Sequence, residues 1–134
     1  MDVSVVLPCL NEEEGVGICL NKIQEVFRNE GLDGEVIIVD NGCTDDTVKV
    51  VKELGFSNVR VVYEFNRGYG NAYRAGFREA KGDIVIMGDA DNTYDFLKRY
   101  IYKDDSEPLP PPNYDFFGVD NKRVYNGAQD QRNT

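Results

Sequence analysis

Residues 36–47 read Val-Ile-Ile-Val-Asp-Asn-Gly-Cys-Thr-Asp-Asp-Thr. The first four are apolar and β-branched, as in a strand that is buried on both faces of a sheet. Asp40-Asn41-Gly42 could form the tight turn of a β-hairpin, but Thr44-Asp45-Asp46-Thr47 opens a helix, with Thr44 as its expected N-cap, rather than a returning strand. This segment therefore predicts a strand, a polar loop and a helix in succession.

The same alternation of strand and helix patterns runs from residue 3 to residue 87. Between the strand-like runs, apolar residues recur at helical spacing, and glycines lie where helices should end and strands begin. The order βαβαβαβ predicts an α/β fold with a Rossmann-like parallel sheet and right-handed connections. The runs that we expect to form strands are Val3–Leu7, Val36–Val39, Val59–Tyr63 and Ile84–Met87.

The composition excludes several classes of function. The chain has 134 residues, which suggests one domain, and no histidine, which excludes histidine-dependent nucleophiles, His-ligated zinc and imidazole acid–base chemistry. With 15 basic and 24 acidic residues the net charge is −9, which argues against nucleic acid or an anionic membrane as the main electrostatic partner. Three cysteines without Cys-x-x-Cys spacing fit a reduced, intracellular protein. We also expect neither a signal peptide nor a transmembrane segment.

The character of the sequence changes after the fourth apolar run. Four of the five prolines lie at Pro108–Pro112, and residues 113–134 are polar, with scattered aromatics and no sustained period. We therefore expect two regions. Residues 1–97 should form the α/β domain, and residues 98–134 a Pro-containing spacer and an irregular, poorly ordered tail.

Polar residues follow three of the four predicted strands, where an open parallel sheet binds its ligands. Each group also has a structural interpretation. Asn11 and Glu14 could form a capping box, and Asp89 and Asp91 could lie in a solvated turn. Placed directly after a buried strand, however, the two aspartates suit Mg²⁺ or Mn²⁺. The three groups are Pro8-Cys9-Leu10-Asn11-Glu12, Asp40-Asn41-Gly42-Cys43-Thr44-Asp45 and Gly88-Asp89-Ala90-Asp91.

The glycine-containing loop after the third strand does not fit a dinucleotide site. Tyr73 stands where the third glycine of G-x-G-x-x-G belongs, and the first strand is followed by no glycine motif. The sequence also contains no P-loop motif. Arg67 and Gly68 offer instead a guanidinium and a close backbone approach at the start of a helix, which suits an anion; a plain loop-to-helix turn explains them equally well.

Four segments in this order resemble glycosyltransferase family 2, and most closely its polyprenyl-phosphate hexosyltransferase branch, to which dolichol-phosphate mannosyltransferase belongs. The resemblance covers about residues 1–97. The segments are Val-Val-Leu-Pro-Cys-Leu-Asn-Glu-Glu-Glu at 5–14, Ile-Ile-Val-Asp-Asn-Gly-Cys-Thr-Asp-Asp-Thr at 37–47, Asn-Arg-Gly-Tyr-Gly-Asn-Ala at 66–72 and Gly-Asp-Ile-Val-Ile-Met-Gly-Asp-Ala-Asp at 82–91.

The resemblance implies the N-terminal half of a GT-A fold, which binds a nucleotide sugar such as a UDP- or GDP-hexose. It implies that Asp40 accepts hydrogen bonds from the base, and that Arg67 and Gly68 close over the nucleotide. Asp89 and Asp91 would hold Mg²⁺ or Mn²⁺ as the family's Asp-x-Asp pair. The full set of substrate-binding residues implied in this way is Pro8, Asn11, Glu12, Asp40, Gly42, Arg67, Gly68 and Asp89.

Such a domain would transfer a hexose, with inversion at the anomeric carbon, to an acceptor such as polyprenyl phosphate. A hydroxyl acceptor would need a general base, which the sequence does not identify, whereas a phosphate acceptor is already anionic. Members of the family continue past the metal motif into an acceptor half that is not recognisable here. The alternative is therefore a truncated, non-catalytic nucleotide-sugar-binding remnant or interaction module. We expect a cytoplasmic location, with the membrane surface as an option.

Overall fold

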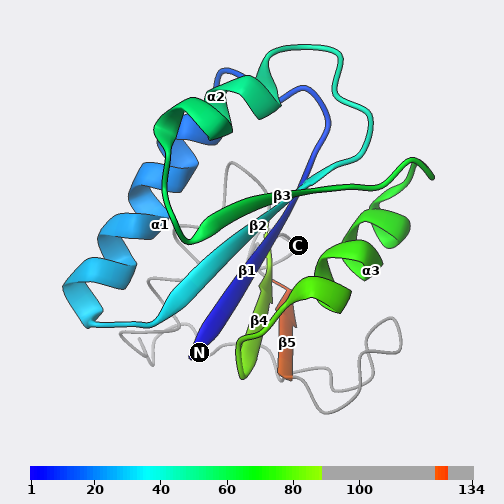
Figure 1. Ribbon diagram of the computed structural model, residues 1–134. Helices are drawn as coiled ribbons and strands as arrows, with labels where there is room; N and C mark the ends of the chain where they lie inside the picture. Colours follow the sequence, from blue (N-terminus) through cyan, green and yellow to red (C-terminus); the bar gives the residue numbers. More distant parts are fainter. Residues whose placement is uncertain (89–122, 127–134) are drawn as a thin grey trace, which may run out of the picture.

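A computed structural model describes residues 1–88 and the backbone of residues 123–126, and it contains a five-stranded sheet with the strand order β3-β2-β1-β4-β5 (Figure 1). All neighbouring strands are parallel. The predicted order of strands and helices and the parallel sheet are confirmed. The elements are β1 (Val3–Cys9), α1 (Val16–Glu30), β2 (Gly34–Asp40), α2 (Thr47–Leu54), β3 (Val59–Tyr63), α3 (Tyr69–Glu79), β4 (Ile84–Met87) and β5 (Arg123–Asn126).

Two strands are longer than the apolar runs that predicted them. β1 and β2 stay paired as far as Cys9 and Asp40, because the backbone ladder of a parallel pair does not require an apolar side chain at every position. β5, which pairs with β4, was not among the predicted strands. Its four residues, Arg-Val-Tyr-Asn, are too few for a periodicity to stand out.

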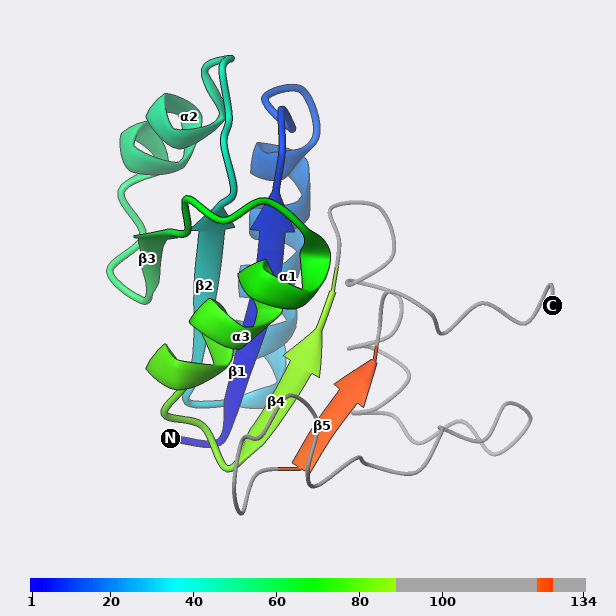
Figure 2. The ribbon, with the colours of Figure 1, turned by 90° about the vertical axis from the view of Figure 1, so that its right-hand side faces the viewer.

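The sheet lies between two helical layers. α1 and α2 cover one face, and α3 covers the other (Figures 1 and 2). Because successive residues of a strand point to opposite faces, Val5 and Leu7 belong to the core on the side of α1, whereas Val6 belongs to the core on the side of α3. Burial on both faces explains why these strands are continuously apolar.

The order of the strands reverses beside β1. From β1 the chain builds outward through β2 and β3, crosses the sheet by way of α3, and returns on the other side of β1 as β4 (Figure 2). Ligands of open α/β sheets bind at such a reversal, beyond the carboxyl ends of the strands concerned. The fold therefore points to a site between the segments that follow β1 and β4.

α3 packs closely on the sheet at Gly76, which is buried in the helix interior. A Cβ atom placed there would lie 2.3 Å from Cγ1 of Val6 and 3.1 Å from Cγ2 of Val39. The first of these distances is too short for any real contact, so only glycine allows this helix–sheet spacing. The spacing in turn sets where the start of α3 lies relative to the carboxyl edge of the sheet.

We expect Gly76→Ala to lower the free energy of unfolding by about 1–3 kcal/mol, because overpacking displaces side chains or backbone. Gly17 is a matched control, since it also lies within a helix but a Cβ there would meet Cγ1 of Val50 at an ordinary 3.6 Å. Gly17→Ala should be neutral or stabilise by up to about 1 kcal/mol, because alanine favours helix. Urea denaturation measures both, and equal midpoints would contradict the close packing of α3.

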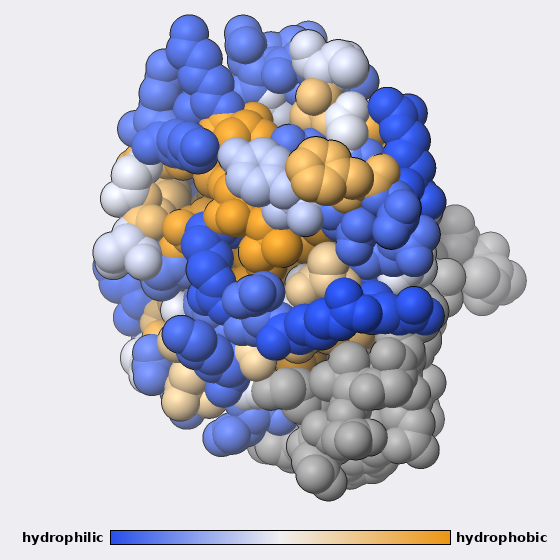
Figure 3. Space-filling view, turned by 45° about the vertical axis from the view of Figure 1, so that its right-hand side comes forward, coloured by the Kyte–Doolittle hydropathy of each residue, from blue (hydrophilic) through white to orange (hydrophobic). Residues whose placement is uncertain are grey.

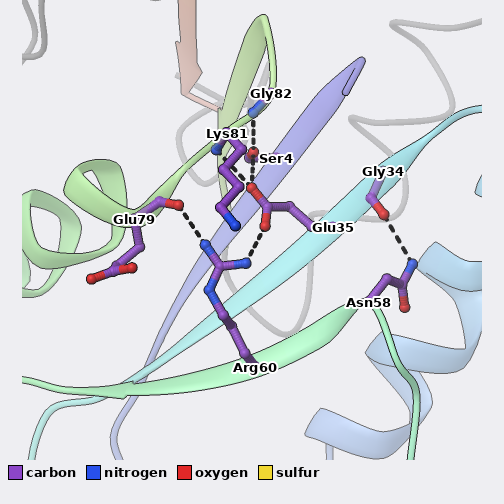
Figure 4. Close-up of polar contacts among 8 residues, drawn as sticks. All are labelled: Ser4, Gly34, Glu35, Asn58, Arg60, Glu79, Lys81 and Gly82. Carbon is purple, nitrogen blue, oxygen red and sulfur yellow. Dashed lines mark hydrogen bonds and ion pairs between the residues drawn. The ribbon is translucent and has the colours of Figure 1, made fainter.

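A buried carboxylate joins the strands at the amino edge of the sheet (Figure 4). Glu35 in β2 is 1% exposed, and it accepts hydrogen bonds from Oγ of Ser4 at 2.6 Å and from the N–H of Lys81 at 2.8 Å. It also forms an ion pair with Arg60 in β3. Oγ of Ser4 accepts in turn from the N–H of Gly82 at 2.8 Å. This cluster ties three strands to the turn between α3 and β4, at the edge opposite the predicted site.

Candidate functional site

The loops after β1, β2 and β3 meet at the carboxyl edge of the sheet (Figure 2). A small pocket of about 120 Å³ opens between the end of β1 and the β3–α3 loop. Three of the residues that line this pocket, Pro8, Arg67 and Gly68, were predicted to bind substrate. The lining includes Pro8, Leu10, Asn41, Arg67, Gly68 and Tyr69.

Asn11 links the loop after β1 to the loop after β2. Its backbone is left-handed, with a φ of 61°, and its Oδ1 accepts hydrogen bonds from the N–H of Thr44 at 2.8 Å and of Asp45 at 3.2 Å. The capping-box interpretation of Asn11 is therefore wrong. α1 begins at Val16, after Gly15, and no side chain caps it.

The start of α2 completes this link. α2 begins at Thr47 after Asp46, and no side chain caps it, so the prediction that Thr44 is its N-cap is wrong. The carboxylate of Asp45 accepts hydrogen bonds from the N–H and hydroxyl of Thr47. The Thr47 hydroxyl oxygen accepts in turn from the N–H of Glu12 at 2.8 Å. Desolvation opposes ionisation of Asp45, but the hydrogen bonds from Thr47 and Glu13 outweigh it and hold the pKa of Asp45 below its usual range.

Asp40 ends β2 and folds the following loop back toward the strand. Its Oδ1 accepts hydrogen bonds from the N–H of Gly42 at 3.0 Å and of Cys43 at 2.8 Å. Two donors fill the two lone pairs of this oxygen. Both backbone donors use Oδ1, which leaves Oδ2 of the half-buried carboxylate as the oxygen that could accept a hydrogen bond from a ligand.

Two thiols lie beside Asp40, and neither is prepared to act as a nucleophile. Burial raises the pKa of Cys9 and of Cys43, so both thiols stay protonated at neutral pH. Sγ of Cys43 donates to the carbonyl of Cys9 at 3.3 Å and accepts from the N–H of Asn11 at 3.4 Å. The Cys43 thiol therefore serves the loop as a hydroxyl would, by hydrogen bonding.

Asn41 belongs to one of the three predicted polar groups, but the sequence assigned it no role of its own in the site. Its side chain, which is buried, donates from Nδ2 to the carbonyls of Glu64 at 2.9 Å and Asn66 at 3.1 Å, and accepts at Oδ1 from the N–H of Gly68 at 3.0 Å. Asp-Asn-Gly is also a common turn sequence, and these partners lie 23 to 27 residues further along the chain. No local pattern could therefore have revealed the contacts.

Gly42 makes room for the side chain of Arg67. The backbone of Gly42 has a φ of +116°, and a Cβ there would lie 3.1 Å from both Nε and Nη2 of Arg67. The guanidinium thus lies against the β2–α2 loop, close to the carboxyl end of β2. This arrangement places one positive charge at an edge that is otherwise rich in carboxylates.

The described part of the chain leads directly up to the predicted metal ligands. The N–H of Gly88 donates to the carbonyl of Val6 at 3.0 Å, and the Gly88 carbonyl accepts from the hydroxyl of Tyr73 at 3.0 Å. Gly88 is therefore fixed beside β1, at the reversal of strand order. Asp89 and Asp91 lie outside the described residues. Within residues 1–88 no three potential metal-ligating side chains cluster.

Exposed aromatic side chains accompany the β3–α3 loop. Phe65 is 91% exposed, and Tyr69, which lines the pocket, is 73% exposed. Figure 3, turned toward the side that carries α3, shows apolar residues gathered around a hollow and hydrophilic residues around them.

Among the described elements, no helix is both long and apolar enough to cross a membrane.

The chain has clear relatives among curated proteins. It is 39% identical over 94 residues to the low-salt glycan biosynthesis hexosyltransferase Agl6 of Haloferax volcanii, a match that covers 70% of this chain and 22% of that protein. It is 36% identical over 94 residues to an undecaprenyl-phosphate 4-deoxy-4-formamido-L-arabinose transferase of Pectobacterium carotovorum, covering 67% of this chain and 29% of that protein. The chain therefore spans less than a third of the length of either relative.

Solved structures and family membership agree with these matches. The glucosyl-3-phosphoglycerate synthase of Mycobacterium tuberculosis, solved with Mn²⁺, UDP and phosphoglyceric acid, has a TM-score of 0.58 and 32% identity over 68% of this chain and 33% of that one. This likeness confirms the predicted GT-A type of fold. The family described as Glycosyl transferase family 2 matches residues 4–103. The chain belongs to glycosyltransferase family 2.

Proposed function

We propose that this chain binds a nucleoside-diphosphate sugar together with a divalent metal ion, and that it takes part in transfer of the hexose to an acceptor. The observation that carries the proposal is a pocket lined by Pro8 and Arg67 at the carboxyl edge of the sheet, with Asp40 at the end of β2 and Gly88 beside β1, where the strand order reverses. Membership of the family supports this proposal, and so do the Mn²⁺ and UDP bound in the solved glucosyl-3-phosphoglycerate synthase.

The residues of the site have distinct proposed roles. Oδ2 of Asp40 would accept an N–H of the base, because Oδ1 is already occupied by two backbone donors. Arg67 would face the diphosphate, where a guanidinium can form two parallel hydrogen bonds. Gly68, with a φ of +125°, would let the backbone approach the ligand closely. The side chain of Asn11 and the N–H of Glu12 are engaged in holding loops, so these two residues would act mainly by shaping the pocket.

Asp89 and Asp91 are the proposed metal ligands, and their chemistry fits Mg²⁺ or Mn²⁺ because both ions prefer carboxylate oxygen. Gly88, which precedes them, is held at the strand reversal. A bound ion would supply positive charge to the diphosphate as the glycosidic bond breaks. Asp40 and Asp45 add negative charge at the same edge, so a diphosphate would otherwise meet an anionic surface.

The acceptor and the domain organisation follow from the family as proposals. Polyprenyl phosphate suits a site without an identified general base, since its nucleophilic oxygen is already ionised, and its attack opposite the leaving group would invert the anomeric carbon. One relative is named an undecaprenyl-phosphate 4-deoxy-4-formamido-L-arabinose transferase. The chain would then work at a membrane surface, with residues 1–97 as the nucleotide-sugar-binding domain and residues 98–134 as a spacer and tail that adds β5 to the sheet of that domain.

Transfer can be distinguished from the alternative of a non-catalytic binding remnant, which the similarity to named transferases does not favour. The full chain is incubated with Mn²⁺, undecaprenyl phosphate in detergent, and radiolabelled UDP-glucose or GDP-mannose. We expect label in the organic phase after extraction. Nucleotide-sugar binding with neither transfer nor hydrolysis would support the remnant instead, and absence of binding would contradict both.

A further inference from the structure

The β3–α3 loop is held to the sheet largely through one side chain. Asn41 is 7% exposed, and its amide makes three hydrogen bonds, all to backbone atoms of residues 64–68. Its own N–H donates to the carbonyl of Cys9 at 3.1 Å, which anchors Asn41 to the end of β1. A single buried amide thus connects the ends of β1 and β2 to the loop that forms the opposite wall of the pocket.

The loop has few other anchors. The N–H of Glu64 donates to the carbonyl of Asp40 at 3.0 Å, which extends the β2–β3 pairing by one residue. Beyond that point, Phe65 is 91% exposed, and Asn66 and Arg67 are also exposed. Apolar burial therefore contributes little to holding residues 65–68. Their other hydrogen bonds run to Glu64, Asn71 and Ala72 within the same segment, so the bonds of Asn41 are the ones among the described residues that tie this loop to the end of β2.

We propose that Asn41 is a positioning residue for nucleotide binding, which holds residues 64–68 so that Arg67 and Gly68 already form the wall of the pocket before the ligand arrives. This inference rests on the proposed function. A ligand that must order a loop loses part of its binding free energy to that ordering, and a loop that is already fixed avoids this cost. An asparagine suits the task because one planar group supplies two donors and an acceptor.

Asn41→Leu tests this role because leucine keeps a similar volume but removes all three hydrogen bonds. Hydrogen–deuterium exchange should become faster in peptides covering residues 64–70, while peptides of β1 and α1 keep their protection. The affinity for UDP in the presence of Mn²⁺ should fall by roughly ten- to a hundredfold, because the three hydrogen bonds that preorganise the wall of the pocket are gone. Asn41→Ser, which admits water in place of the amide, serves if the leucine variant does not fold.

Asn58 is the matched control, at the other end of the sheet (Figure 4). Its Nδ2 donates to the carbonyl of Gly34 and to Oε1 of Gln24, both at 3.0 Å, so it is also an asparagine that bridges two segments. Asn58→Ala should lower stability without changing exchange at residues 64–70 or the affinity for UDP. A merely structural Asn41 would resemble Asn58 in one respect, because its loss would lower stability without changing the affinity for UDP.

The outcomes separate this inference from the proposed function. Unchanged exchange at residues 64–70 in Asn41→Leu would overturn the tether itself, whether or not the chain binds UDP. Faster exchange with unchanged UDP affinity would overturn the positioning role and leave the proposed function standing. Failure of the wild-type chain to bind UDP with Mn²⁺ would overturn the proposed function, and the positioning role with it.

Discussion

Glu35→Ala is expected to lower the free energy of unfolding by about 3 kcal/mol at pH 7. Removing one partner of a buried ion pair typically costs about 3–5 kcal/mol, and the lower end applies because the Arg60 side chain is 35% exposed and can turn toward water. The N–H of Lys81 and the hydroxyl of Ser4 would also lose their acceptor. Urea denaturation at pH 7 measures the effect.

Glu79 provides the control for Glu35. It is an exposed carboxylate at the end of α3, and only its backbone carbonyl takes part in the cluster, as an acceptor for Arg60. Glu79→Ala keeps that carbonyl and removes a charge of the same sign, so stability should change by less than about 0.5 kcal/mol. If the two variants lost similar stability, Glu35 would not hold the amino edge of the sheet together.

The same cluster should make stability depend on pH. Burial alone would raise the pKa of Glu35, but hydrogen bonds from Ser4, Lys81 and Arg60 and the charge of Arg60 outweigh it, so the pKa lies below the ordinary value of 4.5. A lowered pKa contributes stability that is complete above the unfolded-state pKa and is lost as pH falls through the folded-state pKa.

The free energy of unfolding of the wild-type chain should therefore exceed that of Glu35→Gln by a constant amount from about pH 7 to pH 5.5, and by less at lower pH. Unfolding free energies of both chains, measured at intervals from neutral pH down to about pH 3, provide the comparison. A difference in free energy of unfolding that grew as the pH fell would contradict the direction of the Glu35 pKa shift.

Asp91→Ala is expected to abolish the contribution of Mn²⁺ to UDP binding. Loss of residues that merely orient metal ligands costs about 10–100-fold in metal affinity, so loss of a carboxylate ligand should weaken Mn²⁺-supported UDP binding by at least about 100-fold. Calorimetric titration of UDP in the presence of Mn²⁺ measures the affinity. Without the metal, wild-type and variant chains should bind UDP equally weakly.

Asp83→Ala is the control for Asp91→Ala. Asp83 is an exposed aspartate just before β4, at the amino end of that strand, and therefore at the edge of the sheet opposite the site. Its loss changes the net charge by the same amount. The metal assignment would be wrong if the two variants bound UDP with Mn²⁺ equally well.

The order of the elements could be predicted because the strands are buried on both faces. A run such as Val36–Val39 has no polar position, and the helical stripes between the runs have a different period. The same reasoning does not predict how the residues at the ends of these runs are buried. Glu35 directly precedes such a run and looks like its polar boundary, yet it is fully paired inside the sheet.

The sequence predicted where the candidate site lies, but it did not predict the side-chain contacts that form it. The topology alone brings Pro8, Asp40 and Arg67 to one edge of the sheet, and their role in a binding site stays a prediction. The side chains of Asn11 and Asn41, however, bind backbone atoms of loops more than twenty residues away. Such contacts leave no local periodicity, and for Asn11 a local alternative, the capping box, was available and wrong.

The most direct test of the central claim is the melting temperature of the full chain with UDP, in Mn²⁺ and in a metal chelator. Ligand at about a hundredfold excess over its dissociation constant should stabilise the folded chain by about 2.7 kcal/mol, and thus raise the melting temperature by several degrees when Mn²⁺ is present. The chelator should remove most of that rise. No Mn²⁺-dependent rise with UDP, GDP or their sugars at millimolar concentration would contradict nucleotide-sugar binding at the carboxyl edge of this sheet.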